Sequence, residues 1–290
     1  MIARKAPVVR SSDRRLSPVA PELIEAFDRD GFIVLEDVFS DEEVQRMRAT
    51  ANELRDYPQS LADETVVSEP DSGAVRSVFA PHRQSDDFDL VSRDPRLAEV
   101  ARHILGDDVY IHQSRLNYKP AFRGKEFYWH SDFETWHAED GMPDMRALSM
   151  SVMLTDNHPQ AGPVMFVPGS HKQFISCVGE TPEDNYKSSL KRQETGIPDK
   201  DSIASMVAEG GIEAPAPKAG SVVIFDCNTL HASNGNITPF ERMNAFFVFN
   251  AWSNRLEAPF AAGKPRPEHV AHRKVDAPLR RLSRQHRFAA

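Results

Sequence analysis

The segment Phe127-Tyr-Trp-His-Ser-Asp-Phe-Glu-Thr-Trp-His137 concentrates side chains that bind metal ions. His130 and Asp132 are two positions apart, so in an extended chain they point to the same side. An imidazole and a carboxylate placed in this way can converge on one ion. The His-x-Asp pattern alone is a weak signal, because the chain contains 11 His and 43 Asp and Glu.

A metal site at this segment needs a third ligand from elsewhere in the chain. His231 is the candidate, because it follows the apolar segment 221–226, which could return it to the same end of the fold. Two His and one carboxylate on one face of a metal leave open positions and are typical of non-haem Fe(II) oxygenases. By composition alone, four other histidines compete for this role: His112, His137, His158 and His171.

Arg242 opens a second apolar segment shortly after His231. By the period-two rule, Arg242, Asn244, Phe246 and Val248 share one face of a strand. An Arg on the inward face is costly unless an anion pairs with it, and guanidinium groups bind carboxylates in a bidentate manner. The pattern therefore predicts a dicarboxylic co-substrate near the metal. The alternative is the opposite register, with Arg242 in water.

A third polar pattern lies in the segment Val109–Lys119, which we predict to be a strand. Gln113, Arg115 and Asn117 lie on one of its faces. Three different hydrogen-bonding types on one face indicate either a solvated surface or a wall of a binding site. Periodicity does not separate these two interpretations.

Several elements must position these residues. Helices are predicted at 21–30, from Ser40 onward with a Ser40–Glu43 capping box, and at 95–105 between Asp94 and Gly106. Short strands are predicted at 32–35, 109–119, 146–155, 164–167, 221–226 and 243–252. Many short strands separated by turn signals favour a jelly roll or barrel. We therefore expect a mainly β fold with a helical flank.

The chain shows no composition break that would split it into domains. We expect a solvated arm at 1–17, a single domain at 18–273 and a basic C-terminal tail at 274–290 on the surface. The polar stretch at about 171–218 is long for a loop, so it predicts a lid-like insertion with short helices.

Composition excludes several classes of protein. The 290 residues carry a formal charge of −8, which argues against nucleic acid as a partner. The longest apolar runs are far shorter than the roughly 20 residues that span a bilayer, and no secretory signal is visible. Two cysteines cannot form a framework of bridges, so we expect a cytoplasmic protein.

The residues His130, Asp132, His231 and Arg242, with the turn Gly162-Pro-Val-Met-Phe-Val-Pro-Gly-Ser-His171, together resemble the phytanoyl-CoA hydroxylase superfamily. Its members are Fe(II)- and 2-oxoglutarate-dependent dioxygenases on a double-stranded β-helix, a cupin-like jelly roll. The similarity covers about Pro21 to Trp252. Within it, Phe127-x-Trp-His-Ser-Asp-Phe-Glu-Thr-Trp-His-x-Glu-Asp-Gly-Met-Pro143 is similar to the signature of the ectoine hydroxylase family.

The resemblance implies a role for each matching residue. His130, Asp132 and His231 would hold Fe(II), and O2 and 2-oxoglutarate would be co-substrates. The residues implied for 2-oxoglutarate are Arg242, Ser233, Asn117, Arg115 and Phe127, although the family often has Lys in place of Arg115. The residues implied for ectoine are Gln113, Thr135, Trp136, Phe127, Phe246 and Arg266. The expected products are 5-hydroxyectoine, succinate and CO2, made for osmotic protection by a homodimer.

The chemistry of ectoine fits these side chains. Ectoine is a zwitterion with a carboxylate and a delocalised cation. Aromatic faces at Phe127, Trp136 and Phe246 attract cations. Arg266 and Gln113 can donate to the carboxylate, and Trp136 stands in a polar context that disfavours a purely structural role. Two alternatives remain: the same reaction on another small amino-acid-like substrate, or a catalytically silent jelly roll that binds a solute.

Overall fold

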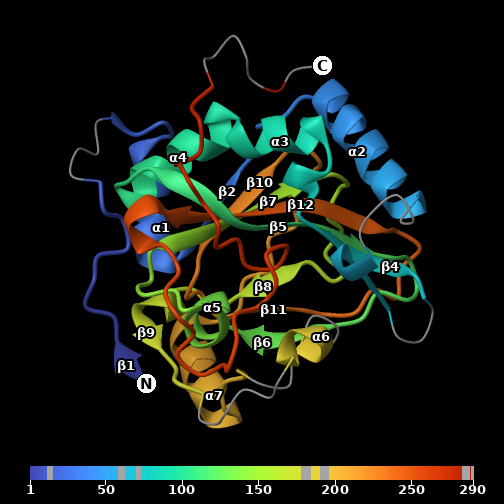
Figure 1. Ribbon diagram of the computed structural model, residues 1–290. Coiled ribbons are helices and arrows are strands. Elements are labelled where there is room, and N and C mark those ends of the chain that lie inside the picture. The colour runs from blue at the N-terminus through green and yellow to red at the C-terminus, as the bar shows by residue number, and fades with distance from the viewer. Residues whose placement is uncertain are drawn as a thin grey trace.

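The computed structural model describes residues 1–11, 16–57, 63–69, 73–177, 184–189, 196–282 and 288. Its core consists of two facing antiparallel sheets (Figure 1). The larger sheet has seven strands, in the order β2 (Phe32–Leu35), β10 (Val222–Asp226), β7 (Ala147–Met153), β12 (Arg242–Ala251), β5 (Val109–Lys119), β4 (Val75–Phe79) and β3 (Val66–Ser68). The smaller sheet pairs β6 (Phe127–His130), β11 (His231–Ser233) and β8 (Val164–Phe166). This architecture confirms the predicted jelly roll.

Strand β12 shows why the large sheet forms. Its side chains alternate, and Met243, Ala245 and Phe247 join the core beneath the helices. The intervening Phe246 and Val248 face the smaller sheet, in a second cluster with Phe166 of β8. Both faces of the strand are thus buried, and β-branched and aromatic residues fill the two layers.

Four helices cover the outer face of the large sheet: α1 (Pro21–Asp30), α2 (Asp41–Asp56), α3 (Asp86–Arg93) and α4 (Pro95–Leu105). Helices α1 and α4 begin and end where the sequence predicts, and α2 begins where it predicts. Ser40 and Glu43 form the predicted capping box of α2. Gly31 ends α1 with a φ of 83°, and a Cβ there would lie 2.4 Å from Nδ1 of His171, so this close approach requires glycine. Helix α3 was not predicted.

The remaining elements lie mainly on the side of the small sheet. They are α5 (Asp132–Asp140), α6 (Asn185–Ser189), α7 (Lys200–Gly210) and the two-residue pair β1 (Ile2–Ala3) and β9 (Gln173–Phe174). Single 3-10 turns occur at η3 (Asp63–Thr65), η4 (Pro81–Arg83), η5 (Ser170–Lys172) and η6 (Trp252–Asn254). Helices α6 and α7 confirm the short helices expected within 171–218. The lid role of this insertion stays a prediction, as do the domain boundaries.

The described part of the N-terminal arm is only partly solvated, whereas we expected a solvated arm. Ile2 and Ala3 pair with β9, and Val8 and Val9 are buried in the main core. The side chain of Arg4 is 3% exposed, with Nη1 lying 2.9 Å from Oδ1 of Asp226. The buried carboxylate of Asp226 thus pairs with Arg4, a basic residue that we expected to be exposed to solvent. Residues 12–15 lie outside the described part.

The described part of the C-terminal tail lies largely on the surface, as expected, but contacts at two points also hold it against the fold. The Leu279 amide donates to the Val109 carbonyl at 2.7 Å. Phe288 is fully buried, and its amide donates to Oδ2 of Asp94 at 3.1 Å. Residues 283–287 and 289–290 lie outside the described part.

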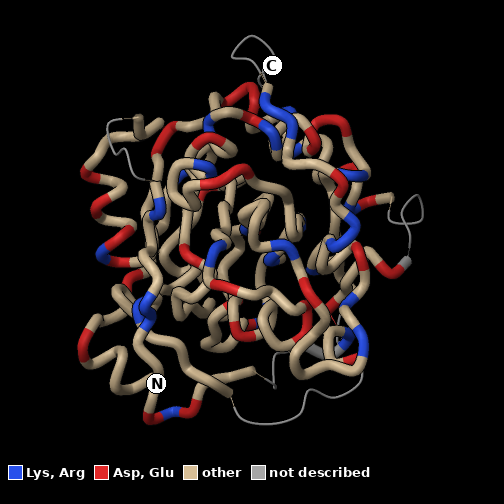
Figure 2. Tube along the Cα trace, turned by 60° about the vertical axis from the view of Figure 1, so that its left-hand side comes forward, with Lys and Arg blue, Asp and Glu red and all other residues tan. Residues whose placement is uncertain are grey.

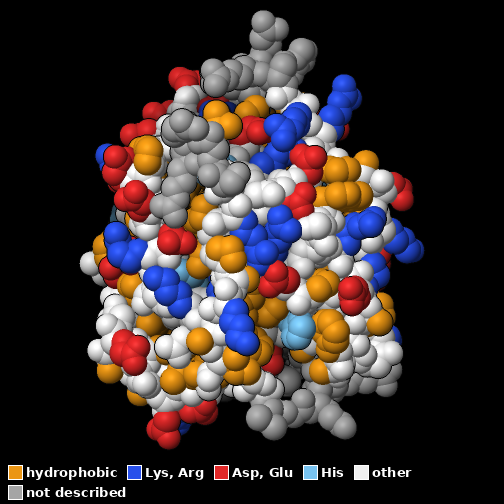
Figure 3. Space-filling model, turned by 90° about the vertical axis from the view of Figure 1, so that its left-hand side faces the viewer, with side chains coloured by type: hydrophobic (Ala, Val, Ile, Leu, Met, Phe, Trp, Pro, Cys, Tyr) orange, Lys and Arg blue, Asp and Glu red, His pale blue; other side chains and the backbone are white. Residues whose placement is uncertain are grey.

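Charges of both signs are interspersed along the chain (Figure 2) and on the face shown in Figure 3. Among the described residues, no helix is both long and apolar enough to cross a membrane.

Candidate functional site

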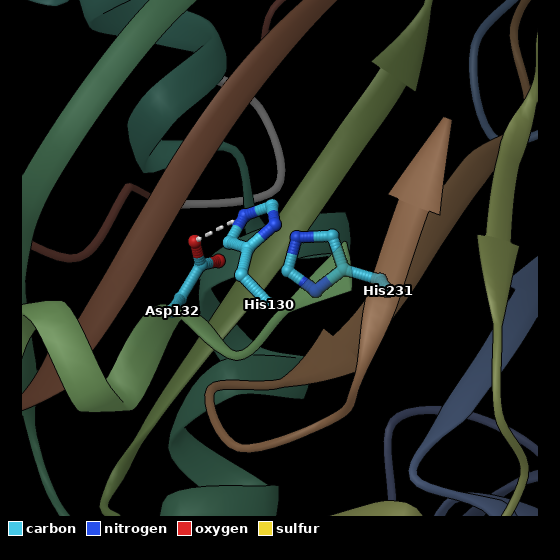
Figure 4. A group of neighbouring side chains, drawn as sticks. All are labelled: His130, Asp132 and His231. Carbon is cyan, nitrogen blue, oxygen red and sulfur yellow. Dashed lines mark ion pairs between the residues drawn. The ribbon is translucent and has the colours of Figure 1, made fainter. Parts of the chain in front are cut away.

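His130, Asp132 and His231 converge, with one ligand atom from each lying within 4.8 Å of the others (Figure 4). His130 ends β6 and is directly opposite His231 at the start of β11. Nε2 of His130 lies 3.7 Å from Oδ1 of Asp132. The other candidate histidines do not join this group, the one potential metal cluster found among the described residues.

The local geometry of His130 and Asp132 agrees with the prediction as far as Ser131. Ser131 keeps an extended backbone, with φ −105° and ψ 141°, so the side chains before and after it point to the same side, as expected. The strand does not continue, because Asp132 is the first residue of α5 and Ser131 is its N-cap. The predicted convergence is therefore correct, and the start of a helix at Asp132 was not predicted.

Backbone carbonyls orient both imidazoles. Nδ1 of His130 bonds to the Tyr128 carbonyl at 2.7 Å, and Nδ1 of His231 bonds to the Thr229 carbonyl at 2.9 Å. In this tautomer the lone pair of each Nε2 is free to bind a metal ion. Burial and the neighbouring His231 lower the pKa of His130 to about 3, so its imidazole is neutral, the form that binds metals. Two imidazole nitrogens and a carboxylate fit Fe(II).

A cavity that opens to solvent adjoins these residues. Both sheets contribute to its walls. Eight of the residues implied by the sequence line it: His130, His231, Arg242, Ser233, Asn117, Arg115, Phe127 and Phe246. The facing sheets thus bring together residues more than 100 positions apart.

Arg242 faces inward, and the alternative register in water is wrong. The residue is 7% exposed, and its Nη1 has no hydrogen-bond partner in the described part of the chain. Burial lowers the pKa of Arg242 to about 10. A buried guanidinium without a protein carboxylate is costly, so the cavity is built to receive an anion.

The polar face of β5 is a cavity wall and not a solvated surface. Arg115 and Asn117 both line the cavity. The guanidinium of Arg115 lies 4.5 Å from the ring centroid of Phe246, and its Nε has no partner among described residues. Asn117 Oδ1 accepts from Ser77 at 3.2 Å. Gln113 is buried but donates instead to the Val270 carbonyl at 2.6 Å.

Trp136 and Arg266 have structural partners that the sequence did not predict. Trp136 is 3% exposed in the second core cluster, with its ring centroid 5.1 Å from that of His112. It is a core residue, contrary to its polar sequence context, because α5 turns this face toward the interior. Arg266 donates from Nε and Nη2 to both carboxylate oxygens of Asp140, at 2.7 and 2.5 Å. Its guanidinium therefore already holds a carboxylate.

Four of the implied substrate residues are not among those that line the cavity: Gln113, Thr135, Trp136 and Arg266. Thr135 is half-buried on α5. Their contacts with a substrate stay predictions.

Sequence reasoning missed four charged residues of the cavity wall: Lys119, Lys125, Arg76 and Glu69. Lys119 continues the polar face of Gln113, Arg115 and Asn117, and extending that period-two series would have found it. Arg76 and Glu69 form a buried ion pair at 3.0 Å. They belong to the edge of the large sheet, where no motif marks them.

Comparisons with known proteins agree with this geometry. The family profile of phytanoyl-CoA dioxygenase (PhyH) matches residues 27–244. The ectoine dioxygenase of Sphingopyxis alaskensis is 56% identical over 280 residues, which is 97% of this chain and 92% of that protein.

Two crystal structures of EctD from S. alaskensis are also similar. One, with 2-oxoglutarate and 5-hydroxyectoine, superimposes with a TM-score of 0.89 at 51% identity, covering 97% of this chain and 94% of that one. The other, with bound Fe, gives a TM-score of 0.88 at 51% identity over 97% and 94% of the two chains. The chain therefore belongs to the phytanoyl-CoA dioxygenase family.

Proposed function

We propose that this protein hydroxylates ectoine to 5-hydroxyectoine, using Fe(II), O2 and 2-oxoglutarate and releasing succinate and CO2. The observation that carries the proposal is the His130–Asp132–His231 group beside a cavity lined by Arg242, whose buried Nη1 has no hydrogen-bond partner among the described residues. The similar S. alaskensis protein, crystallised with 2-oxoglutarate and 5-hydroxyectoine, supports this choice of ligands.

His130 and His231 would hold the iron through Nε2, and Asp132 through a carboxylate oxygen. When bound, the iron supplies the activation of O2 that accompanies oxidative decarboxylation of 2-oxoglutarate. The backbone bonds at both Nδ1 atoms fix the rings before the metal arrives. Ser149 donates to Oδ2 of Asp132 at 3.4 Å and helps to orient the carboxylate.

Arg242 and Ser233 would bind the distal carboxylate of 2-oxoglutarate. Both are buried and line the cavity. Asn117, Arg115 and Phe127 would complete the co-substrate site. Burial of Arg242 in the cavity wall lowers the screening by water, which strengthens its electrostatic contact with an anion.

Ectoine would bind against the aromatic rings that line the cavity, at Phe127 and Phe246. Gln113, Thr135, Trp136 and Arg266 complete the proposed substrate set. Because Asp140 accepts from Nε and Nη2 of Arg266, this guanidinium can offer the substrate carboxylate only its remaining N–H groups, two on Nη1 and one on Nη2.

The test is turnover by purified protein with Fe(II), 2-oxoglutarate, O2 and ectoine, with succinate and 5-hydroxyectoine measured by mass spectrometry. Equal amounts of both products are expected. Succinate without 5-hydroxyectoine would point to another small amino-acid-like substrate. Neither product from iron-loaded protein would favour the solute-binding alternative.

We further propose that the protein is a cytoplasmic homodimer that makes a compatible solute under osmotic stress, with a single domain at 18–273. The free state of Cys177 and Cys227 supports a reducing compartment. Sedimentation equilibrium would test the oligomeric state.

A further inference from the structure

Lys119 is a buried lysine at the cavity wall, directly beside the anion site. It is 9% exposed and is the strand partner of Arg242 across the β5–β12 pair. Directly opposed residues of neighbouring strands project to the same face, so both cations serve the same cavity. Gly124 makes room for this side chain, because a Cβ there would lie 2.3 Å from Cγ of Lys119.

The lysine amino group also orients Ser233. Nζ of Lys119 donates to Oγ of Ser233 at 2.9 Å and to the Asn234 carbonyl at 2.5 Å. A hydroxyl has one hydrogen to donate. Because Ser233 accepts from Lys119, its own hydrogen is free to point at an anion in the cavity. A third contact, to the Gly162 carbonyl at 3.5 Å, is long, so an ammonium at Lys119 has one proton that is weakly bonded.

We propose that Lys119 is a second cationic contact for the distal carboxylate of 2-oxoglutarate, and that it takes up one proton from solvent when this co-substrate binds. The inference rests on the proposed function, since it assigns a residue and a proton to the same co-substrate site. It makes co-substrate affinity depend on pH through a group that is not a metal ligand.

The surroundings of Lys119 explain why a proton is missing before the anion arrives. Burial, Arg242 on β12 and Arg76 on β4 all disfavour the ammonium form. Glu69, after β3, and Glu126, before β6, favour it but contribute less, and the pKa of Lys119 falls to about 6. A dicarboxylate beside Arg242 adds negative charge at this point and raises the pKa of the lysine.

The direction of the pH effect follows from this linkage. Below about pH 6, Lys119 is already charged and co-substrate affinity does not change with pH. Above that pH, each binding event takes up a proton, so the Kd for 2-oxoglutarate rises by up to about tenfold per pH unit. This rise ends where the pH reaches the pKa of Lys119 in the complex.

The experiment is anaerobic calorimetry of the Fe(II)-loaded protein with 2-oxoglutarate at pH 7.5, in three buffers of different ionisation enthalpy. The wild type is expected to take up about one proton per 2-oxoglutarate. Lys119→Met and Lys119→Arg are expected to take up none. Lys119→Met should bind about tenfold more weakly, whereas Lys119→Arg keeps the charge and should bind with a Kd that no longer depends on pH.

Lys125→Met is the matched control, because Lys125 lines the same cavity but is exposed. It should retain the proton uptake of the wild type. Wild-type binding without proton uptake, or equal uptake by wild type and Lys119→Met, would overturn this inference and leave the proposed function intact. Failure of the wild type to bind 2-oxoglutarate at all would overturn both.

Discussion

His130 and His231 lie directly opposite each other on the paired strands β6 and β11, with ring centroids 4.2 Å apart. Strand register therefore fixes two of the three proposed metal ligands. The third, Asp132, depends on a different element, the start of α5. Replacing it should remove a ligand while both rings keep their positions.

We expect Asp132→Ala to lose iron and turnover while it remains folded. Loss of groups that only orient metal ligands already costs about 10–100-fold in affinity, so loss of a ligand should cost at least about 100-fold. The measurements are iron content after desalting and succinate formation. Asp201→Ala removes an exposed carboxylate on α7 and should behave as wild type. Full iron content in Asp132→Ala would show that this carboxylate is not a ligand.

The metal site illustrates what the sequence could predict. Residue type and spacing pointed to His130 and Asp132 but left four other histidines open beside His231, and the resemblance to a known superfamily completed the set. The strand-to-helix turn at Asp132 did not follow, since Ser131-Asp132 supplies a helix start that period-two reasoning passes over. The helices 21–30 and 95–105 were accurate because proline and glycine mark their ends.

Long-range pairing was the part that the sequence could not predict. The partner of Arg266 is Asp140, 126 positions away, and the partner of Arg4 is Asp226. Charge and spacing carry no information about such contacts, because they arise only when distant segments pack. For the same reason, the sequence did not predict that Trp136 packs in the second core cluster.

Arg242→Met should weaken the binding of 2-oxoglutarate far more than that of ectoine. Truncating a buried charge that pairs with an anion costs about 2–5 kcal/mol, and 2 kcal/mol is about 30-fold in affinity. We therefore expect the KM for 2-oxoglutarate to rise at least about 30-fold. Steady-state kinetics with each substrate varied in turn would measure this. Arg255→Met, at an exposed position, is the control. An increase confined to the KM for ectoine would show that Arg242 binds ectoine and not 2-oxoglutarate.

Because of the Asp140–Arg266 pair, the free energy of unfolding should fall at acidic pH. Burial raises the pKa of Asp140, but Arg266 and His112 outweigh it and hold that pKa below its ordinary value. A lowered carboxyl pKa stabilises the fold above the unfolded pKa of about 3.9, and this stability is lost as pH falls through the folded pKa.

Arg266→Met should remove this contribution. Breaking a buried pair costs about 3–5 kcal/mol, so the variant should be less stable at pH 7 and lose less stability than wild type between pH 7 and pH 3. Urea unfolding at both pH values would measure the difference. Arg281→Met removes a guanidinium that is 63% exposed and should change neither value appreciably. An equal loss of stability between pH 7 and pH 3 in wild type and Arg266→Met would show that this pair is not the source of the acid effect.

The packing of the N-terminal arm, which composition did not predict, can be tested directly. Arg4 and Asp226 are 3% and 4% exposed, and Nη2 of Arg4 also donates to the Met145 carbonyl at 2.7 Å. Arg4→Met leaves the Asp226 carboxylate buried without this cation, so we expect a loss of about 3 kcal/mol in the free energy of unfolding. The neighbouring Lys5 is exposed, and Lys5→Met should cost less than about 0.5 kcal/mol. Chemical denaturation of both variants makes the comparison at equal charge. Equal stability of the two would mean that the arm is solvated, as its composition suggested, and that its contacts contribute nothing to the fold.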